Sequence, residues 1–213
     1  MREQLIFETL EKLEKQEHDE IESCVQVITR AFKNDPLFTH ALCSDVEKAS
    51  FSRFLLKKSM ILGEKSIVMK DQTTILGVAS YEKDSGSVLK GLIKMVRFDF
   101  IREIITLKRR LSSESFAFFN RYMRFTTSVR PKVPHYYLVF IGIVPEAQGR
   151  GFGRTILEEI HARADADEAS VGIGLDTENE ANVAYYEKFG YKLIDQRNID
   201  SVTVYAMFRS KVK

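Results

Sequence analysis

An almost unbroken apolar run from Tyr136 to Val144 is the feature that most constrains the fold of this chain. A strand buried on both faces reads as such a continuous run, whereas a half-exposed strand alternates apolar and polar residues. Apolar residues at helical spacing follow from Phe152 to Ala164, and then a short strand at 171–175 and a second helix at 177–188 are predicted. This alternation predicts an α/β sheet in which 136–144 and 171–175 form a buried parallel pair.

Shorter patterns surround this core. Apolar spacing predicts a helix at 21–32, followed by a turn at Asn34-Asp35-Pro36, because the residue preceding a proline is driven out of the α conformation. A second helix, at 46–62, is closed by Gly63. Residues 1–20 are charged and match no clear pattern; Thr9–Leu13 fit either a helix or a short strand, and that choice stays open. The other predicted strands are 66–69 and 74–79, joined as a hairpin, and 191–196 and 202–208, paired antiparallel.

Residues 82–131 read as a helical segment between the hairpin and the central strand. Apolar residues recur by threes and fours from Leu89 to Leu111, Ser112 offers a new N-cap, and Pro131 ends the pattern. Its lysines and arginines would suit an amphipathic helix on a membrane surface, but a solvated face on a packed helix is the favoured interpretation. With 213 residues in all, we expect a single domain, 1–213, that carries this segment as an insertion.

Composition excludes several classes of protein. The 32 Lys and Arg nearly balance the 30 Asp and Glu, so attraction of the whole protein to a nucleic acid is not expected. No apolar run approaches the roughly 20 residues that cross a bilayer, so no membrane partner is expected. The two cysteines form no C-x-x-C pair and the start lacks the apolar stretch of a signal peptide, so we expect a cytoplasmic protein. The four histidines show no metal-ligand spacing, and no metal is expected.

A glycine-rich turn, Gln148–Arg154, stands between the central strand and the next helix. Such a turn directs unpaired backbone N–H groups and the positive end of the helix dipole at an anion. A Cβ at Gly151 or Gly153 would hold a phosphate away from the backbone. The spacing is that of neither a P-loop nor a dinucleotide fingerprint. The turn therefore predicts a phosphate or pyrophosphate site, with a ligand-free glycine-rich helix start as the alternative.

Two motifs are similar to those of a known family. Ile143–Gly153 resembles the Gln/Arg-x-x-Gly-x-Gly/Ala signature of the Gcn5-related N-acetyltransferase (GNAT) superfamily, and Asn179–Tyr191 looks like its second motif, which ends Tyr-Glu-Lys-Leu-Gly-Phe. The long insertion, together with Tyr136-Tyr137-Leu138 and Leu175-Asp176-Thr177, resembles the puromycin-acetyltransferase-like branch. That branch commonly has Glu where this chain has Asp176.

The resemblance implies a fold and a cosubstrate. The implied fold is a mixed, mostly antiparallel sheet whose central parallel strands splay apart, with flanking helices. Acetyl-CoA would place its pyrophosphate on the glycine turn and its pantetheine along the central strand, as an added β-strand pairs with an exposed edge. Gly142 fits a bulge or a close backbone approach. The cofactor-binding residues carried over are Ile141, Gly142, Ile143, Gln148, Gly149, Arg150, Gly151, Phe152, Gly153, Arg154, Asn179, Asn182 and Tyr186.

The predicted helix 177–188 carries three of these residues. Asn179, Asn182 and Tyr186 lie at i, i+3 and i+7 and so share one face. Thr177 and Glu180 have the spacing of a capping box. The resemblance implies that Asn179 hydrogen-bonds coenzyme A and that Tyr186 lies beside its sulfur. Helix-start chemistry for the asparagines and an interfacial aromatic role for Tyr186 are the alternatives.

Acyl transfer to an amine needs a free lone pair, an oxyanion donor and an acid for the departing thiolate. Tyr186 is the expected acid, and a backbone N–H near Ile143 the expected oxyanion donor. The general base stays open: Asp176 is the first choice, with helix capping as its alternative role. The other candidates for the general base are His135, Glu146 and an ordered water, and an amine that arrives neutral would need none of them.

The predicted function is acetyl transfer from acetyl-CoA to a primary amine. A small-molecule acceptor is preferred, because the insertion would cover the acceptor side of the site. The alternatives are a protein or peptide N-acetyltransferase and a non-catalytic, regulatory CoA-binding module. The amine's identity and the oligomeric state, with a homodimer left open, are not encoded in any motif.

Overall fold

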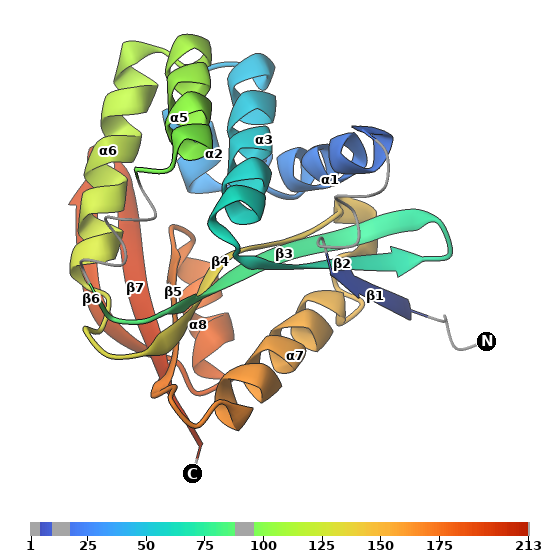
Figure 1. The fold of residues 1–213 in the computed structure, drawn as a ribbon, viewed down its shortest axis with the longest axis vertical. Coiled ribbons are helices and arrows are strands. Elements are labelled where there is room, and N and C mark those ends of the chain that lie inside the picture. The colour runs from blue at the N-terminus through green and yellow to red at the C-terminus, as the bar shows by residue number, and fades with distance from the viewer. Residues whose placement is uncertain (1–4, 10–17, 88–95, 213) are drawn as a thin grey trace.

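The protein is built around one mixed sheet. The computed structural model describes residues 5–9, 18–87 and 96–212. The strand order along the sheet is β1-β2-β3-β4-β5-β7-β6 (Figure 1), and every neighbouring pair is antiparallel except β4 and β5. This confirms the expected mixed, mostly antiparallel GNAT-type sheet. The strands are β1 (Leu5–Thr9), β2 (Lys65–Asp71), β3 (Thr74–Asp84), β4 (His135–Ile143), β5 (Gly172–Thr177), β6 (Lys192–Ile199) and β7 (Val202–Ser210).

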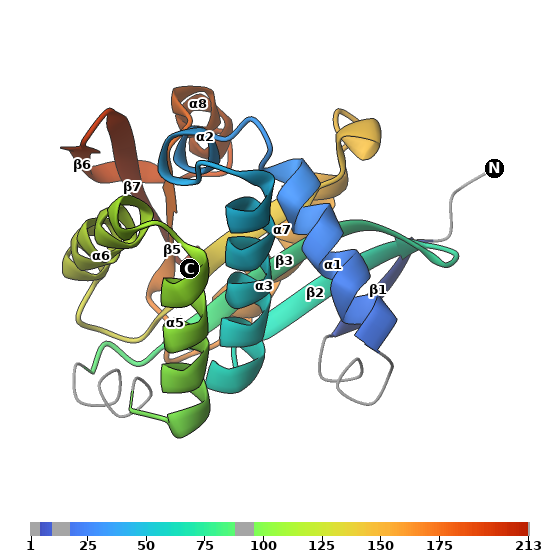
Figure 2. The same cartoon turned by 90° about the horizontal axis from the view of Figure 1, so that it is seen from above.

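Helices cover both faces of this sheet. Figures 1 and 2 show α1, α3 and α5 on one face and α7 on the other. None of the helices in the described ranges combines the length and the apolar character of a transmembrane span. The helical elements are α1 (His18–Ala31), α2 (Pro36–Ala41), α3 (Asp45–Leu62), α5 (Phe98–Arg110), α6 (Ser113–Ser128), the 3₁₀ turn η2 (Pro145–Ala147), α7 (Phe152–Ala166) and α8 (Glu180–Glu187).

The central parallel pair splays apart, as the resemblance implied. Strands β4 and β5 pair only at Tyr136–Leu138 with Ile173–Leu175, and β4 then continues to Ile143 with none of the described strands on that side. A bulge at Val139 bends β4 at this point, because Ser80 and Tyr81 of β3 face Phe140 and Leu138. The gap between the two strands therefore leaves one side of β4 available for pairing.

Gly142 proves to be a site of close approach rather than a bulge. A Cβ at this position would lie 3.0 Å from the Ala31 Cβ and 3.2 Å from the Phe32 ring. Helix α1 thus packs directly on the backbone of β4, beside the unpaired side of that strand.

The segment predicted as an insertion extends the core through α5 and α6. Helix α5 packs along α3, and α6 packs against α2 and β6. An aromatic cluster joins these layers: the Phe51 and Phe119 rings stack at 4.0 Å, and Phe38 meets Phe51 edge-on at 5.8 Å. The side chain of Ser112 caps α6 through the Ser115 N–H, as predicted. The part of the predicted helical pattern at 88–95 lies outside the described residues.

Three local predictions need correction. Pro36 begins the short helix α2, which the sequence reading took as a turn; its N-cap is Asp35. Helix α8 begins at Glu180, because the side chain of Asn179 caps it by accepting the Ala181 N–H at 3.0 Å. Thr177 belongs to β5, so the expected capping box is wrong. Residues 5–9 form β1, and the open choice between helix and strand at 9–13 falls almost wholly on residues 10–17, which lie outside the described residues.

Candidate active site

The glycine turn forms an open cradle at the start of α7. Gly149 and Gly151 have φ angles of +75° and +86°, a backbone conformation that L side chains rarely adopt. A Cβ on either would meet nothing within 4 Å, so the surface above the turn is free. The N-cap Gly151 makes no side-chain cap, and the first intrahelical bond runs from the Thr155 N–H to the Gly151 carbonyl. The first-turn N–H groups before Thr155 therefore suit an anion.

Side chains around the turn complete this cradle. Gln148 donates from Nε2 to the Ile143 carbonyl at 3.0 Å, which ties the turn to the end of β4. Arg150 and Arg154 are exposed; the Arg150 guanidinium lies 4.7 Å from the Phe152 ring, and Arg154 Nε donates to Glu158 at 2.7 Å. Backbone, charge and free space together fit a pyrophosphate.

A cavity of about 310 Å³ opens beside the splay of β4 and β5. Val139–Ile141 of β4, Asp176–Glu178 at the end of β5, and Asn182 and Tyr186 of α8 line one part of it. Helices α5 and α6, residues of α2 and α3, and Phe32 after α1 line most of the rest. The predicted insertion thus contributes directly to the walls of the cavity.

Two carboxylates at the end of β5 share a hydrogen-bonded network with two tyrosines. Tyr122 of α6 and Tyr137 of β4 each donate a hydroxyl to Asp176. The Tyr122 hydroxyl also lies 2.7 Å from Glu178 Oε1. A hydroxyl has one hydrogen, so Tyr122 can donate to only one carboxylate at a time. When Tyr122 donates to Asp176, Glu178 has no hydrogen bond from either tyrosine. When Tyr122 donates to Glu178 instead, Asp176 still accepts the hydroxyl of Tyr137.

The pKa values of these groups follow from their surroundings. Burial raises the pKa of Glu178 well above its ordinary value, and the neighbouring carboxylates of Asp176 and Asp35 raise it further. Burial also raises the pKa values of Asp176 and Asp35, although tyrosine hydroxyls oppose this for Asp176 and backbone N–H groups for Asp35. Glu178 is therefore a proton acceptor suited to work nearer neutral pH than an ordinary glutamate.

The two cationic side chains that line the cavity, Arg130 and Lys58, form ion pairs with other carboxylates. Arg130 pairs with Glu82 at 2.5 Å, and its guanidinium lies 3.5 Å from the Tyr137 ring centroid. Lys58 pairs with the buried Glu64. Among the residues that the structure describes, Asp35, Asp176 and Glu178 consequently have no ion-pair partner within 4.0 Å. Within the same ranges no three histidine, cysteine or carboxylate side chains are grouped so that they could hold a metal ion.

Helix α8 places only part of its predicted site at the cavity. Tyr186 is 8% exposed, lines the cavity and packs edge-on against Tyr191 at 5.5 Å. Burial is the main cause that raises the pKa of Tyr186 above 10. Asn182 also lines the cavity and donates to Thr177 Oγ1 at 3.2 Å. Asn179 instead caps its own helix, and it is not among the lining residues.

The other candidate bases lie away from the cavity. His135 is buried at the start of β4 with Nδ1 2.8 Å from the Val133 carbonyl, and Glu146 is exposed and paired with Arg30.

Sequence reasoning missed Glu178, although its signal was present: carboxylates at i and i+2 at the end of a buried strand are placed on the same side. It also missed Tyr122 and Tyr137, for which the sequence held no comparable signal.

Comparisons with known proteins agree with this geometry. The family model described as "Acetyltransferase (GNAT) family" matches residues 44–191. A search of curated proteins found no match. Among solved structures, a histone acetyltransferase HPA2 and related acetyltransferase from Corynebacterium glutamicum is 19% identical, with 92% of this chain and 94% of that chain covered and a TM-score of 0.62.

Two further structures share the fold at lower identity. The NatC complex bound to Gag peptide and CoA is 12% identical, with 98% and 99% of the two chains covered and a TM-score of 0.55. The ribosomal-protein-S18-alanine N-acetyltransferase from Escherichia coli is 14% identical, with 98% and 96% covered and a TM-score of 0.52. Because the family match spans well over half of the chain, the protein belongs to the GNAT family of acetyltransferases.

Proposed function

We propose that this protein transfers an acetyl group from acetyl-CoA to the primary amine of a small molecule. The observation that carries the proposal is the joint placement of an anion cradle, an unpaired strand side and an acid-lined cavity around the splay of β4 and β5. The insertion that walls the cavity also supports the likeness to the puromycin-acetyltransferase-like branch.

The binding roles follow the order of the elements. Backbone N–H groups of the glycine turn, with Arg150 and Arg154 nearby, would hold the pyrophosphate. The unpaired side of β4 from Val139 to Ile143 would pair with the pantetheine amides. Asn182 and Tyr186 flank the cavity end of that path. We assign Asn179 to capping α8 rather than to contact with the cosubstrate.

The chemical roles fall to Glu178 and Tyr186. The amine nitrogen forms a bond to the acetyl carbon and loses a proton to Glu178, while the carbon–sulfur bond breaks and the thiolate takes a proton from Tyr186. Glu178 is a better base than the first choice, Asp176, because both Asp176 oxygens accept tyrosine hydroxyls. Asp176 positions the two tyrosines and raises the pKa of Glu178.

Incubation with acetyl-CoA and a panel of amines, with free thiol as the readout, tests the proposal. Amine-dependent thiol release supports a transferase. Binding of acetyl-CoA without turnover of any small amine, peptide or protein would favour the non-catalytic module. Turnover of a free peptide N-terminus alone would instead favour the protein acceptor.

The cosubstrate site has its own prediction. Gly151→Asp is expected to weaken acetyl-CoA binding about tenfold or more beyond the effect of Gly151→Asn, because only Asp adds a negative charge at the cradle. Asn is the matched control: it has the same shape and tolerates a positive φ better than most residues. Calorimetric titration with acetyl-CoA measures both variants. Equal affinities of the two variants for acetyl-CoA would show that the pyrophosphate does not bind at this turn.

A further inference from the structure

The walls of the cavity differ sharply from one region to another. Asp35, Asp176 and Glu178 gather near the splay, and no cation among the described residues pairs with them. The region under the insertion is lined by apolar side chains of α3, α5 and α6: Phe54, Phe100, Ile104, Phe116 and Phe119.

Helix α6 links the two regions and sets their separation. Tyr122 contacts the carboxylates, and Phe119 and Phe116 lie three and six residues earlier on the same helix. At 1.5 Å per residue, Phe116 is about 9 Å from Tyr122 along the helix axis. A molecule with its amine at the carboxylates can therefore extend an apolar body of roughly that length beneath the insertion.

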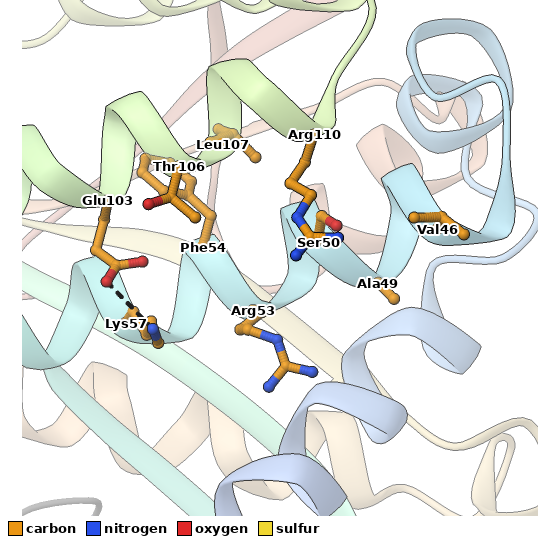
Figure 3. A pocket seen from close by; sticks show the side chains of 10 residues that line it. All are labelled: Val46, Ala49, Ser50, Arg53, Phe54, Lys57, Glu103, Thr106, Leu107 and Arg110. Carbon is orange, nitrogen blue, oxygen red and sulfur yellow. Dashed lines mark hydrogen bonds and ion pairs between the residues drawn. The ribbon is translucent and has the colours of Figure 1, made fainter.

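The apolar region is walled off from a second hollow. A groove of about 340 Å³ lies between α3 and α5, where Lys57 donates to Glu103 at 3.1 Å. Figure 3 shows the side chains that line this groove. Phe54 and Leu107 line both this groove and the cavity, so their side chains form the wall between the two. The apolar region thus ends against side chains, and Met123, 46% exposed on α6, lies at the rim of the cavity.

Resting on the function proposed above, we propose that the acceptor is a singly charged primary amine whose body is a bulky apolar group of aromatic size. Carboxylates without an ion-pair partner attract one ammonium group, and desolvation lowers the pKa of that group, which frees its lone pair for attack on the acetyl carbon. The phenylalanine-lined region favours burial of a ring and leaves a second cation without a partner. The same lining disfavours polyamines and extended peptide backbones.

Three amines of equal chain length test the class: n-butylamine, 4-phenylbutylamine and putrescine. The phenyl ring is expected to raise kcat/KM roughly 10- to 100-fold over n-butylamine, the factor for burying a Phe-sized group. Putrescine is expected to be no better than n-butylamine. A preference for putrescine, or for a peptide N-terminus over 4-phenylbutylamine, would overturn the inference.

A pair of adjacent substitutions tests the location. Ile104 lines the apolar region, whereas Ile105 is 46% exposed and does not line the cavity. Ile104→Trp is expected to lower kcat/KM for 4-phenylbutylamine at least about tenfold and to change that for n-butylamine by less than about threefold. Ile105→Trp should alter neither. Equal losses for the two amines in Ile104→Trp would place the ring elsewhere.

The introduced tryptophan also reports its own position, because the chain has no other. Its emission should be blue-shifted in Ile104→Trp relative to Ile105→Trp, and an exposed indole in Ile104→Trp would contradict the cavity assignment. Calorimetry of amine binding separates the two proposals. Preferential binding of 4-phenylbutylamine without acetylation of any amine in the panel would refute the proposed function, while it would support the assignment of the cavity to a bulky apolar amine. Acetylation without any ring preference would do the reverse.

Discussion

Glu178→Gln is expected to lower kcat/KM by about 10²–10⁴-fold, the usual contribution of a general base. The same substitution should make the protein more stable at neutral pH. Burial and two nearby carboxylates raise the pKa of Glu178 in the folded protein, so the folded state binds this proton more tightly than the unfolded chain does. The free energy of unfolding gained from this tighter proton binding is complete below about pH 4.5, and it is lost as the pH rises through the raised pKa of Glu178. Because Gln does not ionise, the Glu178→Gln variant does not lose stability in this way as the pH rises.

Two pH profiles measure this prediction. The parent kcat/KM should rise with pH as Glu178 ionises, and Glu178→Gln should lack that rise. Thermal unfolding should show the stability of the variant rising relative to the parent as the pH increases above about 4.5, the ordinary pKa of glutamate. Glu180→Gln, at an exposed position two residues away, is the matched control and should resemble the parent in both. An unchanged pH profile of kcat/KM in Glu178→Gln would show that another group is the general base.

Asp176→Asn separates a positioning role from a catalytic one. Removing the Asp176 charge relieves the repulsion that raises the pKa of Glu178, so the activity rise should move to lower pH but persist. If Asp176 were itself the base, the rise would disappear in this variant.

Tyr186→Phe is expected to lower kcat by about 10²–10⁴-fold while acetyl-CoA still binds nearly as well as in the parent. The ring and its packing against Tyr191 are kept, and only the hydroxyl is lost. Because burial raises the pKa of Tyr186, the hydroxyl stays protonated throughout the neutral range and can donate as the carbon–sulfur bond breaks. An acyl donor with a less basic thiol should narrow the difference, since its thiolate needs the proton less.

Tyr185→Phe provides the control for this experiment. The two tyrosines are adjacent in α8, but Tyr185 is 38% exposed and does not line the cavity. It should retain parental kcat and affinity. A loss of acetyl-CoA affinity in Tyr186→Phe that matched its loss of turnover would make the hydroxyl a binding group. No change in either would leave Tyr186 an interfacial aromatic.

The sequence alone predicted the features that depend on residues within a turn or a strand of one another. The continuous apolar run at 136–144 identified β4 at the centre of the sheet, and Gly63 closed α3 in the left-handed conformation as expected. Gly151 was likewise recognised from its place between a strand and a helix. Each of these depends on local backbone conformation, which the identity of a few neighbouring residues decides.

Tertiary structure decided the rest of the candidate site. Tyr122 and Glu178 are 56 residues apart in the chain and meet only because α6 docks beside the end of β5. The raised pKa of Glu178 depends on Asp35, which arrives from the opposite end of the chain as the cap of α2. Even the choice of Asn179 over Thr177 as a helix cap followed from how far β5 extends along β7. Burial, charge repulsion and cavity shape are sums over groups brought together by folding, so no pattern of neighbouring residues contains them.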